Sequence, residues 1–172
     1  MFAGVDPHPA LAAYAFDSRP INAALRGIPA PVMDSAPRPL APPELDEIVV
    51  ALRRRMRPLD RAVRVFRAVD LRPLLGAREP GQAVGHCLVD QGFMSTGPDA
   101  ASVERFSHGG QTIVLHAPAG TRALPLPASL VPWRANQQSE LVFDVGTTVA
   151  FGSVDRNGQP NGIIVDQSST LL

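Results

Sequence analysis

Two segments of the sequence place charged or reactive side chains inside apolar runs. The run VFRAV puts Arg67 among β-branched and aromatic neighbours, where a buried guanidinium is unfavourable unless it has a partner. The run GFMSTG ends on the hydroxyls of Ser95 and Thr96. A hydroxyl pair at the end of an apolar strand either caps the next element or points into a site. These residues therefore indicate either local structural contacts or a polar ligand site.

Two further pairs of polar side chains share one face of an element. Gln138 and Glu140 lie two residues apart at the entry to the apolar run ELVF, so in a strand both side chains point to the same side. Asn22 and Arg26 lie four residues apart in INAALRG, which places them on one side of a helix. Taken singly, each feature has an ordinary structural explanation: an ion pair, a helix cap, a charge on an edge strand or a solvated helix end. The ordered set is what points to a function.

The N-terminal part of the sequence is predicted to be helical. Residues 10–27, ALAAYAFDSRPINAALRG, contain strong helix formers and a Gly stop, with Pro20 suited to the first turn of a second short helix. Residues 42–56, PPELDEIVVALRRRM, have acidic residues in the first turn, basic residues in the last and one apolar face. The Pro-rich stretch 27–44 is predicted to be a linker, because proline removes a backbone donor and fixes φ.

Short β-branched runs separated by Gly and Pro begin near Arg64 and continue toward the C-terminus. The predicted strands are VRVFRAV, GFMST, QTIVLHAP, RALPL, ELVF, TTVAFGSVD and GIIVDQ. Between the last two lies Asn157-Gly158, a strong hairpin signal. At 172 residues with 45% hydrophobic content, the chain is predicted to form one α+β domain, residues 1–172, mainly helical over 1–60 and β-rich over 61–172.

Charge and cysteine content argue against several function classes. Sixteen basic and sixteen acidic residues give a formal net charge of zero, so no strong footprint for duplex nucleic acid or an anionic membrane is visible. All the basic residues are Arg, which fits GC-rich codon usage or, alternatively, avoidance of ubiquitination in a eukaryotic cytosol. The single Cys87 precludes an intrachain disulfide and is interpreted as a small buried residue. With no apolar run of about 18 residues and no recognisable signal peptide, a soluble chain is expected.

In chain order, VFRAV, GFMSTG and QSE resemble the Arg, Ser-Thr-Ser and Glu motifs of the bacterial ADP-ribosyltransferase exoenzymes. The segment from Tyr14 through INAALRG, the run IVLHAPAGTRAL and the run SELVFDVGTTVAF are also similar to parts of that family. The resemblance extends from about Tyr14 to Phe151. It implies an ADP-ribosyltransferase-like fold, with N-terminal helices packed on two mostly antiparallel sheets that form an NAD cleft. The Gln-x-Glu motif is similar to that of the clostridial Rho-modifying exoenzymes.

The resemblance assigns roles to five of these residues. Glu140 would stabilise the positive charge that develops on the ribose when nicotinamide leaves NAD. Ser95 would orient Glu140 through a hydrogen bond. Arg67 and Arg26 would bind the pyrophosphate, because a planar guanidinium matches phosphate oxygens, and Asn22 would bind beside Arg26.

The remaining roles come from the same resemblance. Thr96 belongs to the NAD-binding set, and Phe106 corresponds to the aromatic residue that stacks on nicotinamide, with a core Phe as the alternative. Gln138, in a position where Glu accompanies arginine acceptors, argues for a different acceptor, such as an amide side chain or guanine. Trp133 would bind the target protein. Gly97 occupies the position of the family's third hydroxyl.

The implied function is a mono-ADP-ribosyltransferase toxin, secreted or translocated, that acts in the cytosol of a target cell. Its partners would be NAD as substrate, a host or rival-cell protein such as a GTPase, and an immunity protein if the producer is susceptible. No metal site is predicted, because the four His residues have no Cys or carboxylate at ligand spacing. Three alternatives stay open: an NAD glycohydrolase toxin, ADP-ribosylation of nucleic acid, and a catalytically inactive binding module on the same fold.

Overall fold

Helices come first along the chain and strands follow, as the sequence predicts. The computed structural model describes residues 9–28, 42–72, 76, 79–104, 110–126 and 140–166. The helical elements are α1 (Pro9–Phe16), α2 (Arg19–Leu25), α3 (Pro42–Arg53), the 3₁₀ helix η1 (Pro80–Ala83) and α5 (Ala100–Glu104). The greater part of the predicted Pro-rich linker, residues 29–41, lies outside the described residues.

The N-terminal helices form where the sequence signals place them. Pro20 occupies the first turn of α2, where its missing N–H costs no hydrogen bond. Helix α3 has Glu44 in its first turn and Arg53 in its last, so both charges complement the helix dipole. Leu52 of α3 is fully buried. The predicted amphipathic helix is therefore confirmed, and its apolar face packs toward the strands.

The strands form two sheets. Their bounds are β1 (Arg57–Pro58), β2 (Val63–Val69), β3 (Cys87–Asp90), β4 (Met94–Thr96), β5 (Gln111–Ala117), β6 (Arg122–Leu126), β7 (Glu140–Phe143), β8 (Thr147–Val154) and β9 (Pro160–Asp166). A four-stranded sheet has the order β1-β6-β7-β4, and a five-stranded sheet has the order β2-β5-β9-β8-β3. Neighbouring strands are antiparallel except for β5 and β9, which are parallel. The expected pair of mostly antiparallel sheets is confirmed.

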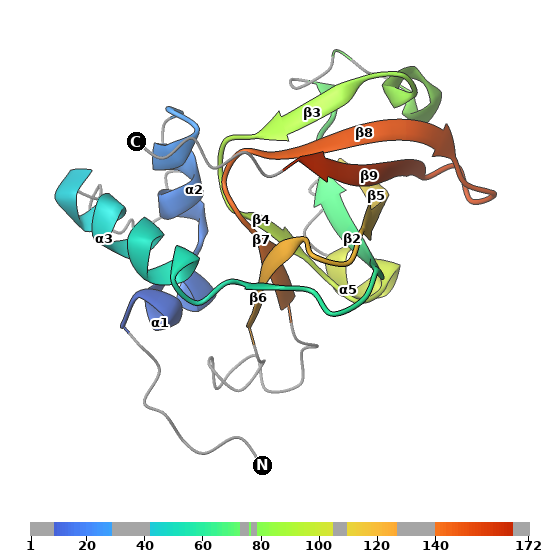
Figure 1. Cartoon of the computed structure of the whole chain (residues 1–172). Helices are drawn as coiled ribbons and strands as arrows, with labels where there is room; N and C mark the ends of the chain where they lie inside the picture. Colours follow the sequence, from blue (N-terminus) through green and yellow to red (C-terminus); the bar gives the residue numbers. More distant parts are fainter. Residues whose placement is uncertain are drawn as a thin grey trace.

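The four-stranded sheet is buried on both faces, so it lies between the helices and the five-stranded sheet (Figure 1). Phe143 of β7 and Met94 of β4 face the core between the two sheets. Val142 of β7 faces the second core, which the sheet shares with residues of α1, α2 and α3. This alternation follows from the two-residue period of a strand. The sheets also join directly, because Phe66 of β2 and Gly97 exchange two backbone hydrogen bonds of 2.9 and 2.8 Å.

The predicted hairpin and the predicted burial of the cysteine have opposite outcomes. Strands β8 and β9 pair in antiparallel fashion around a turn in which Gly158 has a φ of +77°, which confirms the signal of Asn157-Gly158. Cys87, in contrast, is exposed, so its interpretation as a buried residue is wrong. The reason is that strand β3 lies at the edge of the five-stranded sheet and turns Cys87 toward solvent.

No helix in the described part of the chain is long and apolar enough to cross a membrane.

Candidate active site

One carboxylate, Asp90 at the end of β3, joins three parts of the chain. It accepts hydrogen bonds from Nε and Nη2 of Arg26, at 3.0 and 2.8 Å to Oδ1, and from Nη2 of Arg67, at 2.6 Å to Oδ2. The backbone N–H of Gly92 donates to the same carboxylate at 2.9 Å. Helix α2, strand β2 and the loop after β3 therefore meet at a single side chain.

The three side chains of this cluster differ in their exposure to solvent. The side chain of Asp90 is 7% exposed, that of Arg67 is 13% exposed and that of Arg26 is 29% exposed. A buried carboxylate and a buried guanidinium each need a charged partner, because desolvation penalises an isolated charge by several kcal/mol. The three side chains together carry one net positive charge. Arg26 is the member most open to solvent, so an anion can approach the cluster from its side.

Helix α2 approaches the loop after β3 closely because residue 92 is glycine. A Cβ atom there would lie 2.8 Å from Oδ1 of Asn22 and 3.0 Å from Cζ of Arg26. The amide oxygen of Asn22 instead accepts the backbone N–H of Phe93 at 2.8 Å. The predicted common face of Asn22 and Arg26 is thus confirmed, since both side chains contact the loop between β3 and β4.

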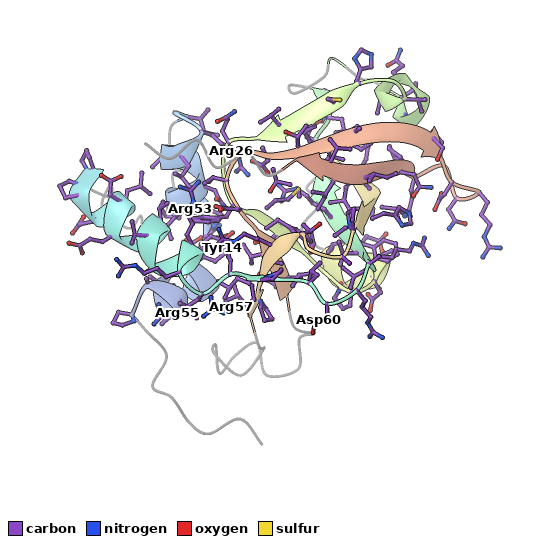
Figure 2. All side chains as sticks on the ribbon, viewed as in Figure 1. Tyr14, Arg26, Arg53, Arg55, Arg57 and Asp60 are labelled. Carbon is purple, nitrogen blue, oxygen red and sulfur yellow. The ribbon has the colours of Figure 1, made fainter. Side chains whose placement is uncertain are left out.

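A second polar network surrounds the hydroxyl of Tyr14. Its oxygen lies 2.9 Å from Oγ of Ser95 and accepts a hydrogen bond from Nδ2 of Asn22 at 3.3 Å. The backbone carbonyl of Ser95 accepts from Nη1 of Arg67 at 3.2 Å, which connects this network to the Asp90 cluster. Figure 2 shows Tyr14 and Arg26 between the N-terminal helices and the strands.

Burial raises the pKa of the Tyr14 hydroxyl, and this desolvation is the largest of its influences. Hydrogen bonds that Ser95 and Asn22 can donate to the ionised oxygen, and the positive charge of Arg67, act in the opposite direction, while the negative charge of Glu140 raises the pKa further. Tyr14 is therefore a neutral hydroxyl at physiological pH, able to donate one hydrogen bond.

Ser95 and Glu140 project from the same face of the four-stranded sheet. Ser95 of β4 lies opposite Val142 of β7, and Glu140 precedes Val142 by two residues. Residues related in this way are diagonal neighbours on one face of an antiparallel pair, within reach of a long side chain. Leu141 and Phe143 point to the opposite face of the sheet from Glu140, since both pack in the core between the sheets.

Thr96 points to the opposite face of the sheet from Ser95, and Gly97 follows the end of β4. Thr96 is 2% exposed, and its hydroxyl donates to the carbonyl of Leu141 at 2.7 Å. Gly97 lies against helix α5, where an added Cβ atom would collide with Oγ of Ser102 and would lie 2.7 Å from Cγ1 of Val103. Helix α5 therefore occupies the space that a side chain at residue 97 would need.

Three residues with predicted roles, Gln138, Phe106 and Trp133, lie outside the described residues. The structure brings together Asn22, Arg26, Arg67, Ser95 and Glu140. Sequence reasoning did not assign a role to Asp90 or to Tyr14. An arginine in an apolar strand requires an acidic partner, but the sequence does not show which of several Asp residues supplies it.

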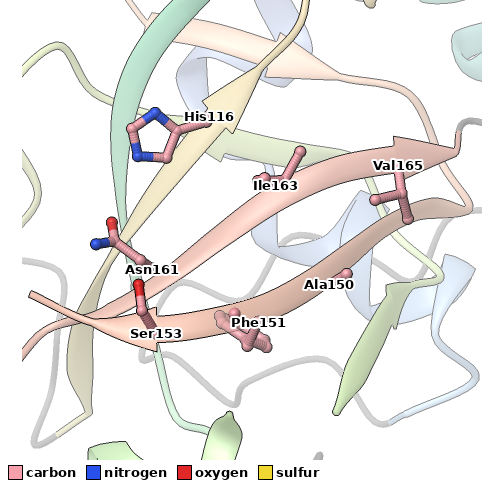
Figure 3. A pocket seen from close by; sticks show the side chains of 8 residues that line it. His116, Ala150, Phe151, Ser153, Asn161, Ile163 and Val165 are labelled. Carbon is pink, nitrogen blue, oxygen red and sulfur yellow. The ribbon is translucent and has the colours of Figure 1, made fainter. Parts of the chain in front are cut away.

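The outer face of the five-stranded sheet carries a separate hollow of about 350 Å³ (Figure 3). His116, Asn161 and Ile163 line it, together with residues of β8. It lies on the opposite side of that sheet from the core between the sheets, so it is separate from the Asp90 cluster. Within the described ranges, no group of three or more His, Cys, Asp or Glu side chains could hold a metal ion.

No protein-family model and no curated protein matches the sequence. Solved structures do match the fold. The C3larvin toxin, an ADP-ribosyltransferase from Paenibacillus larvae, has a TM-score of 0.63 at 15% identity, over 96% of this chain and 90% of that chain. Plx2a, an ADP-ribosyltransferase toxin from Paenibacillus larvae, has a TM-score of 0.64 at 16% identity, over 91% of this chain and 84% of that chain. C3stau2 from S. aureus, solved with NAD, has a TM-score of 0.61 at 17% identity, over 92% of this chain and 85% of that chain.

The chain therefore has the fold of the bacterial ADP-ribosyltransferase toxins, and the fold expected from the ordered motifs is confirmed.

Proposed function

We propose that this chain is a mono-ADP-ribosyltransferase effector that cleaves NAD and transfers ADP-ribose to a non-arginine acceptor on a target protein. The fold of its structural neighbours supports the reaction class. The observation that carries the proposal is the convergence of the three motif residues. Arg67 donates to the backbone of Ser95, and Glu140 is the diagonal neighbour of Ser95 across the β4–β7 ladder.

The proposed chemistry uses the carboxylate of Glu140. Breaking the bond between nicotinamide and ribose develops positive charge on the anomeric carbon, and a fixed carboxylate beside the ribose stabilises that charge. Ser95 holds the carboxylate in place from the neighbouring strand. Nicotinamide leaves as a neutral molecule that takes the electron pair of the broken C–N bond, so the positive charge stays on the ribose, beside this side chain.

The arginine cluster is proposed to bind the pyrophosphate of NAD, with Asn22 beside Arg26, while the buried Thr96 supports this binding set through its hydrogen bond to the carbonyl of Leu141. Arg26 and Arg67 are held together by Asp90, and Arg26 keeps Nη1, which Asp90 does not use, as a further donor. Guanidinium groups suit phosphate oxygens because their planar donors can bind two oxygens at once. The single net positive charge of the cluster fits the binding of an anion.

The acceptor specificity is proposed from Gln138, two residues before Glu140. An amide side chain both donates and accepts, so it can bind another amide, whereas a carboxylate suits a guanidinium acceptor. Phe106 is proposed to stack on nicotinamide and Trp133 to bind the target protein, for instance a GTPase. The proposal also includes secretion or translocation into the target cell, and an immunity protein if the producer is itself susceptible.

The test is nicotinamide release from NAD by the purified protein, together with labelling of a eukaryotic or bacterial lysate by labelled NAD. Glu140→Gln should lower the rate of NAD cleavage about a hundredfold or more, because it removes the stabilising charge. Glu47→Gln, on the exposed side of α3, is the matched control and should leave the rate unchanged. Gln138→Ala should abolish the labelling of protein while NAD hydrolysis continues.

The other outcomes separate the alternatives. Cleavage of NAD without any labelled macromolecule would establish a glycohydrolase. Label that survives protease and is lost with nuclease would establish a nucleic-acid acceptor. If the wild-type protein neither cleaves NAD nor labels the lysate, the proposal is wrong and the chain is a binding module on this fold.

A further inference from the structure

Tyr14 is a buried tyrosine whose hydroxyl lies beside the proposed site. It is the single tyrosine of the chain and is 2% exposed. Its ring packs edge-on against Phe93, with the ring centroids 5.5 Å apart. A phenylalanine would fill the same space without needing hydrogen-bond partners, since only the hydroxyl of tyrosine must be satisfied when buried. The hydroxyl therefore needs an explanation other than packing.

The direction of the hydrogen bonds follows from the amide of Asn22. Its oxygen accepts the N–H of Phe93 at 2.8 Å, so the group that faces Tyr14 is the NH₂ group, which can only donate. The oxygen of Tyr14 is then an acceptor from Asn22, and its own proton requires a second partner. The described partner within reach is Oγ of Ser95, at 2.9 Å.

The opposite arrangement is unfavourable. If Ser95 donated to Tyr14, the Tyr14 oxygen would accept twice and its proton would be buried without an acceptor among the described residues. Leaving a buried donor unsatisfied is unfavourable, because the group has lost its hydrogen bond to water. Tyr14 therefore donates to Ser95, and Ser95 keeps its own proton for another acceptor. Glu140 is the diagonal neighbour of Ser95 on the same face of the sheet.

Resting on the proposed function, we propose that Tyr14 is a positioning residue: its hydroxyl donates to Ser95 and thereby directs the proton of Ser95 toward the carboxylate of Glu140. The order of donation is Asn22 to Tyr14, Tyr14 to Ser95, and Ser95 to Glu140. The first two steps are the contacts of 3.3 and 2.9 Å. Helix α1 thus contributes to catalysis by orienting the serine.

The first test is the kinetics of nicotinamide release by Tyr14→Phe, which keeps the ring and removes the hydroxyl. We expect kcat to fall about tenfold, while KM for NAD stays within about twofold, because the hydroxyl orients the carboxylate and does not contact NAD. Ser95→Ala should lower kcat similarly. The kcat of the double variant should be little lower than that of either single variant, because both changes interrupt the same chain of hydrogen bonds. Ser102→Ala is the control. It removes a hydroxyl of helix α5 that donates to the carbonyl of Asp99, and its kcat and KM should match those of the wild type.

A second test covers the case in which Tyr14→Phe does not fold. Because the chain has one tyrosine, biosynthetic incorporation of 3-fluorotyrosine changes Tyr14 alone. A fluorinated phenol ionises at lower pH, and an ionised Tyr14 cannot donate to Ser95, so the alkaline loss of kcat should shift to lower pH. Arg67 and Glu140 are the charged groups that act on this hydroxyl, and neither is changed by the substitution.

The outcomes distinguish this inference from the proposed function. If the wild type cleaves NAD and Tyr14→Phe has the same kcat, or if the losses of Tyr14→Phe and Ser95→Ala multiply, the positioning role is wrong and the proposed function stands. An unshifted pH profile of the fluorotyrosine protein has the same meaning. If the wild type releases no nicotinamide, the proposed function fails and the positioning role fails with it.

Discussion

Arg26 and Asp90 form an ion pair between residues 64 positions apart in the sequence, with Nε and Nη2 of the guanidinium on one carboxylate oxygen at 3.0 and 2.8 Å. Arg67 binds the other oxygen of the same carboxylate at 2.6 Å. One acidic side chain therefore fixes the relative positions of two arginines from different elements. Because the arginines would otherwise repel each other, the stability of this region depends on Asp90.

Asp90→Asn should destabilise the protein. The amide keeps an acceptor for the N–H of Gly92 but removes the counter-charge of two half-buried guanidinium groups. Removing one partner of a buried ion pair typically costs about 3–5 kcal/mol, and because the partly exposed Arg26 can be hydrated, we expect a loss of about 3 kcal/mol. The free energy of unfolding, measured by urea denaturation at neutral pH, checks this value.

Asp70→Asn is the matched control for that experiment. Asp70 also binds an arginine, Arg72, at 2.8 Å, but this pair is open to solvent. Exposed ion pairs contribute little to stability, so the control should unfold close to the wild type. Equal stability of the two variants would contradict the view that burial makes the Asp90 cluster important.

Arg67→Lys should weaken NAD binding. Arg67 reaches the carboxylate of Asp90 with Nη2 and the carbonyl of Ser95 with Nη1, and a single ammonium group cannot hold both positions with the geometry of a guanidinium. We expect KM for NAD in the nicotinamide-release assay to rise about tenfold, the loss of about one charge-assisted hydrogen bond. Arg64→Lys, on the same strand but exposed and stacked on Phe66, should leave KM unchanged. A normal KM for Arg67→Lys would argue against a role in binding the pyrophosphate.

Gly97→Ser, which restores the third hydroxyl of the family pattern, should destabilise this chain. The new Cβ would collide with Ser102 and lie 2.7 Å from Val103, so helix α5 must shift to make room. Overpacking of this kind costs about 1–3 kcal/mol. Thermal unfolding measures the loss, with Gly152→Ser as the control, because nothing lies within 4 Å of the Cβ position at residue 152. An unchanged melting temperature for Gly97→Ser would contradict the expected loss, because it would show that helix α5 can shift without a cost in stability.

The elements of this fold could be predicted because each has a local cause. Strand β2 (Val63–Val69) coincides with the β-branched run that predicted it, and Pro20 lies in the first turn of α2, where its fixed φ suits a helix. The same local reasoning missed β3, whose four residues CLVD alternate exposed and buried positions at a sheet edge. It also predicted a buried Cys87, because the sequence does not reveal which strand lies at the edge.

The site was predicted in part, for a different physical reason. Arg67 was recognised because a charge within an apolar strand is unusual, and Asn22 with Arg26 because of their helical spacing. Asp90 and Tyr14 were not recognised, since their importance depends on contacts between segments far apart in the sequence. Such contacts are set by the packing of α1 and α2 on the strands, which no local pattern encodes.

The raised pKa of Tyr14 should make the protein less stable at alkaline pH. Burial is the main cause of the shift, so the folded state holds the phenolic proton more strongly than the unfolded chain, where tyrosine ionises at about pH 10. Between these two pKa values the folded state carries more protons, and the free energy of unfolding therefore falls as pH rises, with a limiting slope of about 1.4 kcal/mol per pH unit. Below about pH 10 the contribution is fully present.

The sequence makes this effect unusually easy to isolate, because it contains one tyrosine and no lysine. Urea unfolding should be followed by circular dichroism from pH 8 to pH 11 in a Cys87→Ser background, so that the thiol does not contribute. Tyr14→Phe in that background should remove the decline above about pH 10. If the decline persists without the phenol, another group causes it; if the wild type shows no decline, Tyr14 is more accessible to water than its 2% exposure indicates. The second result would also weaken the argument that the Tyr14 proton must be donated to Ser95, because that argument depends on the hydroxyl being shielded from solvent.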